Sequence, residues 1–111
     1  MRLQNNIDID KVCDMLMLDR GNVVNLLKKF AAMLPEMSQE IKSAIADNDL
    51  KLVNMLGHKL KGTAGNFRIQ TLYEVAEEIN KLPNIDDSSA IMDRLDACIK
   101  TVATEIQSLH I

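Results

Sequence analysis

Apolar residues recur at alternating intervals of four and three residues along the first half of the chain. This spacing places them on one face of an α-helix and predicts a single long helix from about Asn22 to Asp47. Pro35 lies inside the segment and removes one helical hydrogen bond, but the apolar positions stay in phase on both sides of it. We therefore expect one bent helix rather than two. Its apolar stripe consists of Val23, Leu27, Phe30, Leu34, Met37, Ile41 and Ala44.

The same spacing predicts four further helices. A short one is expected at residues 8–17, and Asn48 or Asp49 can cap a helix that runs to about Phe67. Another apolar face covers residues 69–79 and is closed by Pro83, and a last helix spans about residues 91–109. Because each apolar face needs a partner and short connections make neighbours run in opposite directions, we expect an all-α fold. Its predicted architecture is an antiparallel four-helix bundle with a short additional N-terminal helix.

Composition agrees with one domain that covers residues 1–111. The chain has 111 residues, of which 47% are hydrophobic, enough for a single core. Aromatic residues make up only 3%, and no strand-like alternation competes with the helical pattern. Cys13 and Cys98 form no CxxC pair and sit at apolar positions, so we expect both to be reduced and buried.

Charge and motif content exclude several classes of function. The net charge of -3 offers no basic field for a nucleic-acid backbone. No apolar run reaches the roughly 20 residues of a membrane span, and the N-terminus lacks a signal peptide, so we expect a cytoplasmic protein. His58 and His110 lie far apart and no cysteine cluster is present, which argues against a metal site. The stretch GTAG lacks the spacing of a phosphate-binding loop.

The third predicted helix carries an unusual outer face. Its apolar residues point roughly opposite to His58, which we expect to face solvent. A glycine inside a helix costs about 1 kcal/mol relative to alanine, so Gly57, Gly62 and Gly65 need a reason. Without side chains at 62 and 65, another protein can approach the imidazole closely. The expected neighbours of His58 on this face are Lys51, Asn54, Lys61, Gly62 and Gly65.

These residue types suit the handling of an anion. The unperturbed pKa of a histidine side chain is about 6.5, so a neutral and nucleophilic fraction exists at neutral pH. Lys61, three residues after His58, can neutralise an anion at the ring. The alternative is a solvated histidine without function, with Gly65 ending the helix as the residue after its C-cap. That alternative explains Gly65 but not Gly62.

The stretch GHKLKGTAGNFRIQTLYEVAEEI resembles the signature of the histidine phosphotransfer (HPt) domain family. The signature reads approximately His-x-Leu-Lys-Gly followed by small residues, and residues 58–64 match it without a gap. The likeness extends through the preceding long helix, with Phe30 and Pro35, and through the following helix. Two positions depart from the usual pattern: Arg68 stands where many members have Gly, and Gly57 stands where Ala is common.

The resemblance implies a phosphocarrier without kinase activity of its own. His58 would accept a phosphoryl group from the aspartyl phosphate of one receiver domain and pass it to the aspartate of another. Lys61 would steady the phosphoryl oxygens, Gly62 would make room for the receiver, and Asn80 would hydrogen-bond the imidazole at Nδ1. The implied partners are response-regulator receiver domains and a hybrid sensor histidine kinase. The chain itself is expected to be a monomer without cofactor or metal, with Mg²⁺ on the receiver.

Docking of a receiver is expected to use apolar residues that the core does not absorb, because flexible methionines suit a surface that meets several partners. Two alternatives stay open: a helical adaptor with His58 merely exposed, and a pseudo-phosphotransfer module that docks receivers without carrying phosphate. Phosphorylation of His58 separates both from the carrier. The predicted partner-binding residues are Met15, Met17, Val24, Lys51, Asn54, Met55, Lys59 and Gly65.

Overall fold

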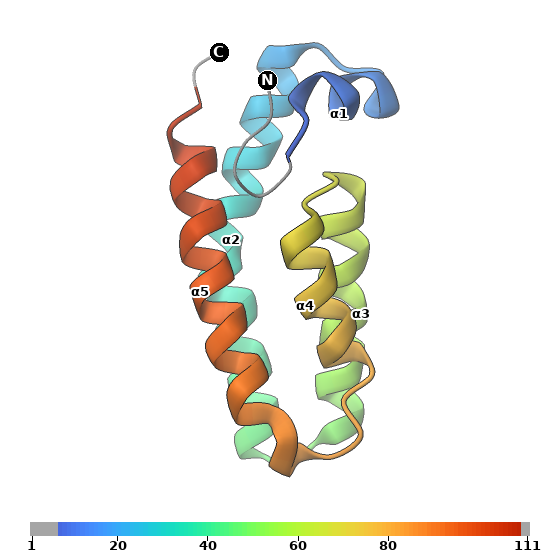
Figure 1. Cartoon of the computed structure of the whole chain (residues 1–111), viewed down its shortest axis with the longest axis vertical. Helices are drawn as coiled ribbons and strands as arrows, with labels where there is room; N and C mark the ends of the chain where they lie inside the picture. The colour runs from blue at the N-terminus through green and yellow to red at the C-terminus, as the bar shows by residue number, and fades with distance from the viewer. Residues whose placement is uncertain (1–6, 110–111) are drawn as a thin grey trace.

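The computed structural model describes residues 7–109, which fold into α-helices with no β-strand among them (Figure 1). The prediction of an all-helical fold is confirmed. Residues 1–6, together with His110 and Ile111, lie outside the described part. The elements are α1 (Ile9–Leu16), α2 (Arg20–Ala46), α3 (Leu50–Asn66), α4 (Gln70–Asn80), the 3-10 turn η1 (Ile85–Asp87) and α5 (Ser88–Gln107).

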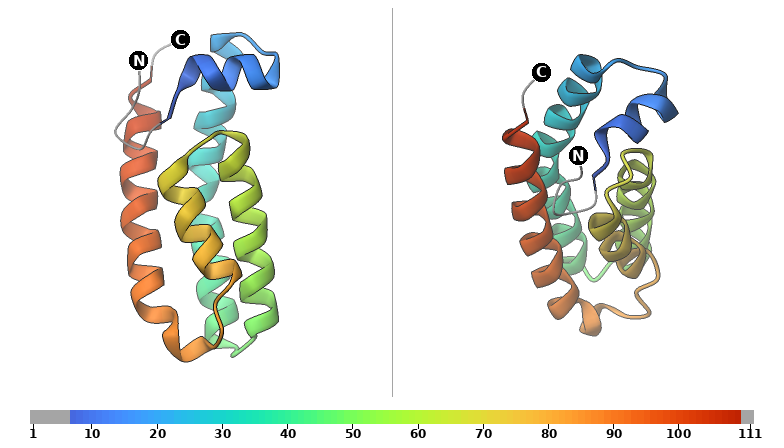
Figure 2. Two further views of the ribbon diagram at one scale, coloured as in Figure 1. Left: turned by 45° about the vertical axis from the view of Figure 1, so that its right-hand side comes forward. Right: turned by 45° about the horizontal axis from the view of Figure 1, so that its top comes forward.

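The four longer helices lie along the long axis of the molecule and alternate in direction (Figures 1 and 2). α2 packs beside α5, and α3 packs beside α4. α1 lies across one end of the bundle, against the start of α2 and above the turn from α3 to α4 (Figure 2). This end of the molecule therefore brings together three segments that are distant in sequence.

Local sequence explains where the helices begin. The side chains of Asp8, Asp19 and Asp49 each accept a hydrogen bond from the backbone N–H three residues later, at 3.2, 2.8 and 3.1 Å. An N-cap carboxylate satisfies one of the N–H groups that a helix start leaves unpaired. The predicted cap at Asn48 or Asp49 is thus provided by Asp49. α2 continues through Pro35 as one helix, as predicted.

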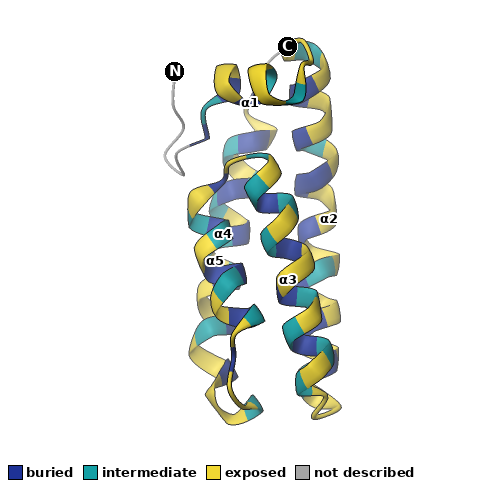
Figure 3. Cartoon of the chain, turned by 90° about the vertical axis from the view of Figure 1, so that its right-hand side faces the viewer, coloured by how far each residue is buried: buried dark blue, intermediate teal, exposed yellow. Residues whose placement is uncertain are grey.

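Buried residues line the inner side of each helix (Figure 3). The stripe predicted for α2 is buried except for Met37, which is half-buried. Cys13 and Cys98 are free thiols, as expected, but both are half-buried rather than buried. Burial raises the pKa of the Cys98 thiol, which disfavours the reactive thiolate. No helix among residues 7–109 has the length and apolarity needed to cross a bilayer.

Candidate functional site

His58 lies midway along α3 on its exposed side, as the helical spacing predicted. The opposite side of the helix carries Val53, Leu60 and Ala64, which are fully buried. Because these three residues fix the rotation of α3 against the core, they also fix the outward direction of His58. The imidazole makes no hydrogen bond with any residue from 7 to 109.

The three glycines of α3 have different surroundings. A Cβ atom on Gly62 would meet nothing within 4 Å, so this side of the helix next to His58 is open. A Cβ atom on Gly65 would touch the ring of Tyr73 at 3.5 Å, which is an ordinary contact. Gly65 is half-buried and lies inside α3, so it is not the residue after the C-cap. Only Gly62 matches the expected open approach to the ring.

Gly57 has a structural role that the sequence analysis missed. It is buried, and a Cβ atom there would lie 2.5 Å from the backbone N of Asn80 and 2.8 Å from two atoms of Ile79. Real Cβ atoms essentially never come this close to a backbone. The glycine therefore permits α3 and α4 to pack closely just beside His58, which explains the departure from alanine at this position.

The prediction that Asn80 orients the imidazole is wrong for this structure. The Asn80 side-chain amide donates to the backbone carbonyl of Asn54 at 3.0 Å. In return, Nδ2 of Asn54 donates to the carbonyls of Ile79 at 2.9 Å and Leu82 at 3.2 Å. Ile79 lies in the last turn of α4 and Leu82 lies just beyond it, so Asn54 binds the C-terminal end of α4 from the neighbouring helix.

The Asn54 and Asn80 pair nevertheless supports the site. In a regular α-helix the carbonyl of residue 54 also accepts the N–H of residue 58. Asn80 therefore fastens to α4 the turn of α3 that leads into His58. Asn54 is half-buried with its amide engaged between the helices, so it is a positioning residue and not the free contact residue that we predicted.

Lys61 reaches across to α4. Its Nζ lies 4.0 Å from Oε1 of Glu77 and 5.9 Å from the ring centroid of Tyr73, and its side chain is only 22% exposed. Lys81 contacts the same Glu77 oxygen at 3.2 Å. The sequence analysis did not find Glu77, because no periodic pattern signals a contact between two helices. Glu77 thus holds one lysine next to His58 and a second one further along α4.

The predicted docking residues are partly confirmed as exposed. Met15, Met17 and Met55 are 51%, 90% and 58% exposed. Lys51 and Lys59 are exposed as well. Val24 is fully buried, and its prediction as a contact residue is wrong: α1 packs against the start of α2, so the buried face of α2 is wider there than the stripe alone indicates. Exposed apolar residues that the sequence analysis missed are Leu18, Leu26 and Met33.

Among residues 7–109 no group of three or more His, Cys, Asp or Glu side chains is arranged to hold a metal ion. The site therefore consists of an exposed imidazole, an adjacent open helix surface and a lysine one turn away.

Comparison with known proteins agrees with this geometry. A search of the curated proteins and a search of the solved structures gave no match. The model of the Hpt domain family matches residues 25–105, which include α3 with His58 and most of the bundle. Because this match spans well over half of the chain, the protein belongs to the Hpt domain family, whose members act in histidine phosphotransfer.

Proposed function

We propose that this protein carries a phosphoryl group on His58, which it accepts from the aspartyl phosphate of one receiver domain and passes to an aspartate of another. Hpt domains act with receiver domains in phosphorelays, which gives the class of partner. The observation that carries the proposal is the exposed imidazole beside Gly62, where even a Cβ atom would meet nothing within 4 Å. A partner can therefore bring its reacting group up to the ring.

The proposed transfer is an in-line displacement. A ring nitrogen of neutral His58 donates its lone pair to phosphorus as the bond from phosphorus to the aspartate oxygen breaks. The aspartate leaves as a carboxylate, and the proton on the other ring nitrogen passes to water. Such a reaction depends on positioning and charge neutralisation. We infer that the receiver supplies Mg²⁺ for this purpose, and that the present chain is a carrier and not an autonomous enzyme.

Lys61 lies three residues after His58 on α3 and is the cation that we propose for the phosphoryl group. Its contact with Glu77 at 4.0 Å is long for an ion pair, and Lys81 binds the same carboxylate more closely at 3.2 Å. Lys61 can therefore turn to a phosphoryl group on His58 without leaving Glu77 unpaired. This exchange lowers the electrostatic cost of moving the lysine, since a half-exposed carboxylate keeps one counter-charge.

The second candidate is a module that docks receivers, or another helical partner, without carrying phosphate. The exposed methionines Met15, Met17 and Met55 favour it, since flexible apolar side chains on a surface suit protein contacts. The proposed partners of the carrier are a receiver domain and a hybrid sensor kinase, and the chain is proposed to act as a monomer in either case. The chemistry at His58 distinguishes the two candidates.

The deciding experiment mixes the chain with a phosphorylated receiver domain and Mg²⁺, beside a His58→Gln variant. Transfer of a label that is acid-labile and alkali-stable to the wild type, and its loss in the variant, supports the carrier. Lys100→Gln is a matched control, because this exposed lysine lies on α5 and is not among the predicted contact residues. Labelling of His58→Gln would rule out His58 as the acceptor. Binding of receivers without any label would favour the docking module.

A further inference from the structure

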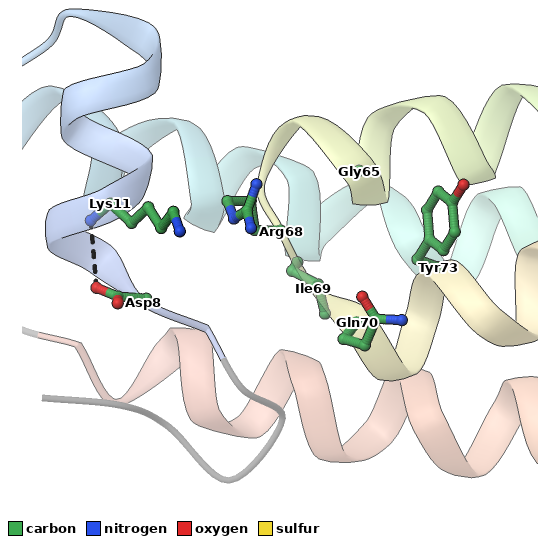
Figure 4. Close-up of a pocket in the computed structure, with 7 residues that line it drawn as sticks. All are labelled: Asp8, Lys11, Gly65, Arg68, Ile69, Gln70 and Tyr73. Carbon is green, nitrogen blue, oxygen red and sulfur yellow. Dashed lines mark hydrogen bonds between the residues drawn. The ribbon is translucent and has the colours of Figure 1, made fainter.

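A pocket with two cationic residues in its wall lies at the end of the bundle covered by α1. Its volume is about 460 Å³, and its wall includes Lys11 of α1, Gly65 of α3, Arg68 of the turn between α3 and α4, and Gln70 and Tyr73 of α4. Figure 4 shows the Lys11 side chain extending toward Arg68. The pocket is assembled from two segments that are more than fifty residues apart in sequence.

The two cations of this pocket have no acidic partner among residues 7–109. Lys11 forms no ion pair there, and the guanidinium of Arg68 has only a weak contact with Sδ of Met15, at 3.5 Å. Asp8 also lines the pocket, but its Oδ1 accepts a hydrogen bond from the backbone N–H of Lys11 as the cap of α1. With one acid, Asp8, and two cations, Lys11 and Arg68, the wall of the pocket has a net charge of +1, so a bound anion would stabilise this arrangement.

Arg68 occupies its position at a conformational cost. Its φ of 55° is left-handed, and α3 ends there with two hydrogen bonds, from Arg68 N–H to the carbonyl of Gly65 and from Ile69 N–H to that of Ala64. Glycine is the usual residue at this position of such a helix ending, because the left-handed conformation costs other residues about 1 kcal/mol. A strained residue that also presents an unpaired charge to a pocket points to a binding role.

The pocket lies on the same side of α3 as His58. Gly65, in its wall, follows His58 by seven residues, which corresponds to almost two full turns and a displacement of about 10 Å along the helix. A standard protein interface covers about 800 Å² per partner, which corresponds to a radius of about 16 Å. A domain centred on His58 therefore extends over the pocket.

We propose that Lys11 and Arg68 bind a carboxylate side chain of the receiver domain that docks over His58, and that this contact selects among receivers. The proposal rests on the proposed function for the class of partner. Arginine is suited to this role because its planar guanidinium can bind a carboxylate through two hydrogen bonds. Receivers that carry an acidic residue at the matching position dock more tightly than those that carry a lysine there.

The test compares binding of a receiver domain to the full chain and to a Lys11→Gln/Arg68→Gln double variant. Binding is measured by titration at low and high salt, in the His58→Gln background so that phosphoryl transfer plays no part. We expect the double variant to raise the Kd about tenfold at 50 mM salt and about twofold at 500 mM salt, because salt screens exposed charges. Lys100→Gln is the matched control, since this exposed lysine lies on α5.

The outcomes separate this proposal from the proposed function. If the double variant and Lys100→Gln bind the receiver with equal Kd, and transfer to wild-type His58 is intact, the role of the pocket is overturned. The proposed carrier function is then unaffected. If the pocket instead binds a free anion, titration with inorganic phosphate shifts the NMR amide signals of Arg68 and Gln70, while the double variant leaves receiver binding unchanged. This result also overturns the proposed contact with the receiver. Receivers that neither bind nor transfer overturn both. Restored binding between Arg68→Glu and a receiver with one carboxylate changed to lysine supports the contact.

Discussion

At the scale of single residues, two glycines of one helix have opposite environments. Gly57→Ala places a Cβ atom 2.5 Å from the backbone of Asn80, and a backbone cannot move aside as a flexible side chain can. We expect this variant to lower the free energy of unfolding by about 2 to 3 kcal/mol, as overpacked cores do. Urea unfolding followed by circular dichroism at 222 nm measures the change.

Gly62→Ala is the control for that experiment, because the added methyl group meets nothing within 4 Å. Here the better helix propensity of alanine dominates, and we expect the free energy of unfolding to rise by about 0.5 to 1 kcal/mol. If Gly57→Ala were as stable as Gly62→Ala, α3 and α4 would not be in the close contact that the structure shows.

Arg68 gives a second prediction at this scale. Arg68→Gly removes the strain of the left-handed backbone, and we expect it to raise the free energy of unfolding by about 1 kcal/mol. Arg68→Ala removes the same side chain but keeps the strain, so it should leave stability nearly unchanged. Thermal unfolding of the three proteins distinguishes the cases. Equal gains from Gly and Ala would show that the arginine side chain, and not the backbone, is the source of the cost.

At the scale of elements, a polar cluster joins α2 to α5. Asp96 on α5 accepts a hydrogen bond from the hydroxyl of Ser38 and pairs with Nζ of Lys42, both at 2.7 Å. Partial burial works against ionisation of Asp96, but the bonds from Lys42 and Ser38 and the charge of Lys42 together outweigh it, so its pKa lies below the ordinary value of 3.8. The ionised carboxylate therefore stabilises the contact between the two helices.

This lowered pKa sets the pH dependence of an Asp96→Asn variant. A group whose pKa is lower in the folded state stabilises the fold above its unfolded pKa and loses that contribution as the pH falls through the folded value. We expect the variant to be less stable by about 1 kcal/mol at pH 7, a modest figure because the side chain is partly exposed. The difference should shrink toward zero as the pH falls below the ordinary value of 3.8.

Urea unfolding of both proteins at about five pH values between roughly 2.5 and 7 measures this difference in the free energy of unfolding. Asp93→Asn is the matched control, since Asp93 is an exposed acid on the same helix and makes no ion pair within residues 7–109. A difference that stayed constant down to the lowest pH would mean that the charge of Asp96 contributes nothing.

At the scale of the whole molecule, the bundle is expected to act as a rigid carrier. His58 is exposed on the outside of α3 and makes no hydrogen bond with residues 7–109, so we expect a phosphoryl group there to disturb no core contact. We expect phosphorylation to change the melting temperature by less than about 2 °C. Amide shifts should be confined to α3 near His58 and to Glu77 and Lys81, where Lys61 is released.

Two-dimensional NMR of the chain before and after phosphoryl transfer tests this expectation, with His58→Gln treated in the same way. Shifts that spread to α2 and α5 would indicate that the phosphoryl group changes the packing of the bundle. The chain would then respond to its cargo rather than only carry it.

The sequence determined the helices and the outward direction of His58. Apolar spacing and capping aspartates act within a few residues, so their effect can be read along the chain. Asp49 begins α3, and the buried Leu60 turns His58 to solvent. The signature around His58 also indicates the family, because it consists of residue types at fixed positions along one helix.

The tertiary structure alone decided how the surroundings of His58 are built. Asn80 bonds to Asn54, Lys61 contacts Glu77, and Gly57 lies against the backbone of α4. Each of these contacts depends on how closely α4 approaches α3 and at which rotation. Likewise, Val24 is buried because α1 folds back over the start of α2. Distances between helices are set by the packing of all side chains in the core. The spacing of apolar residues along one helix therefore does not predict these distances.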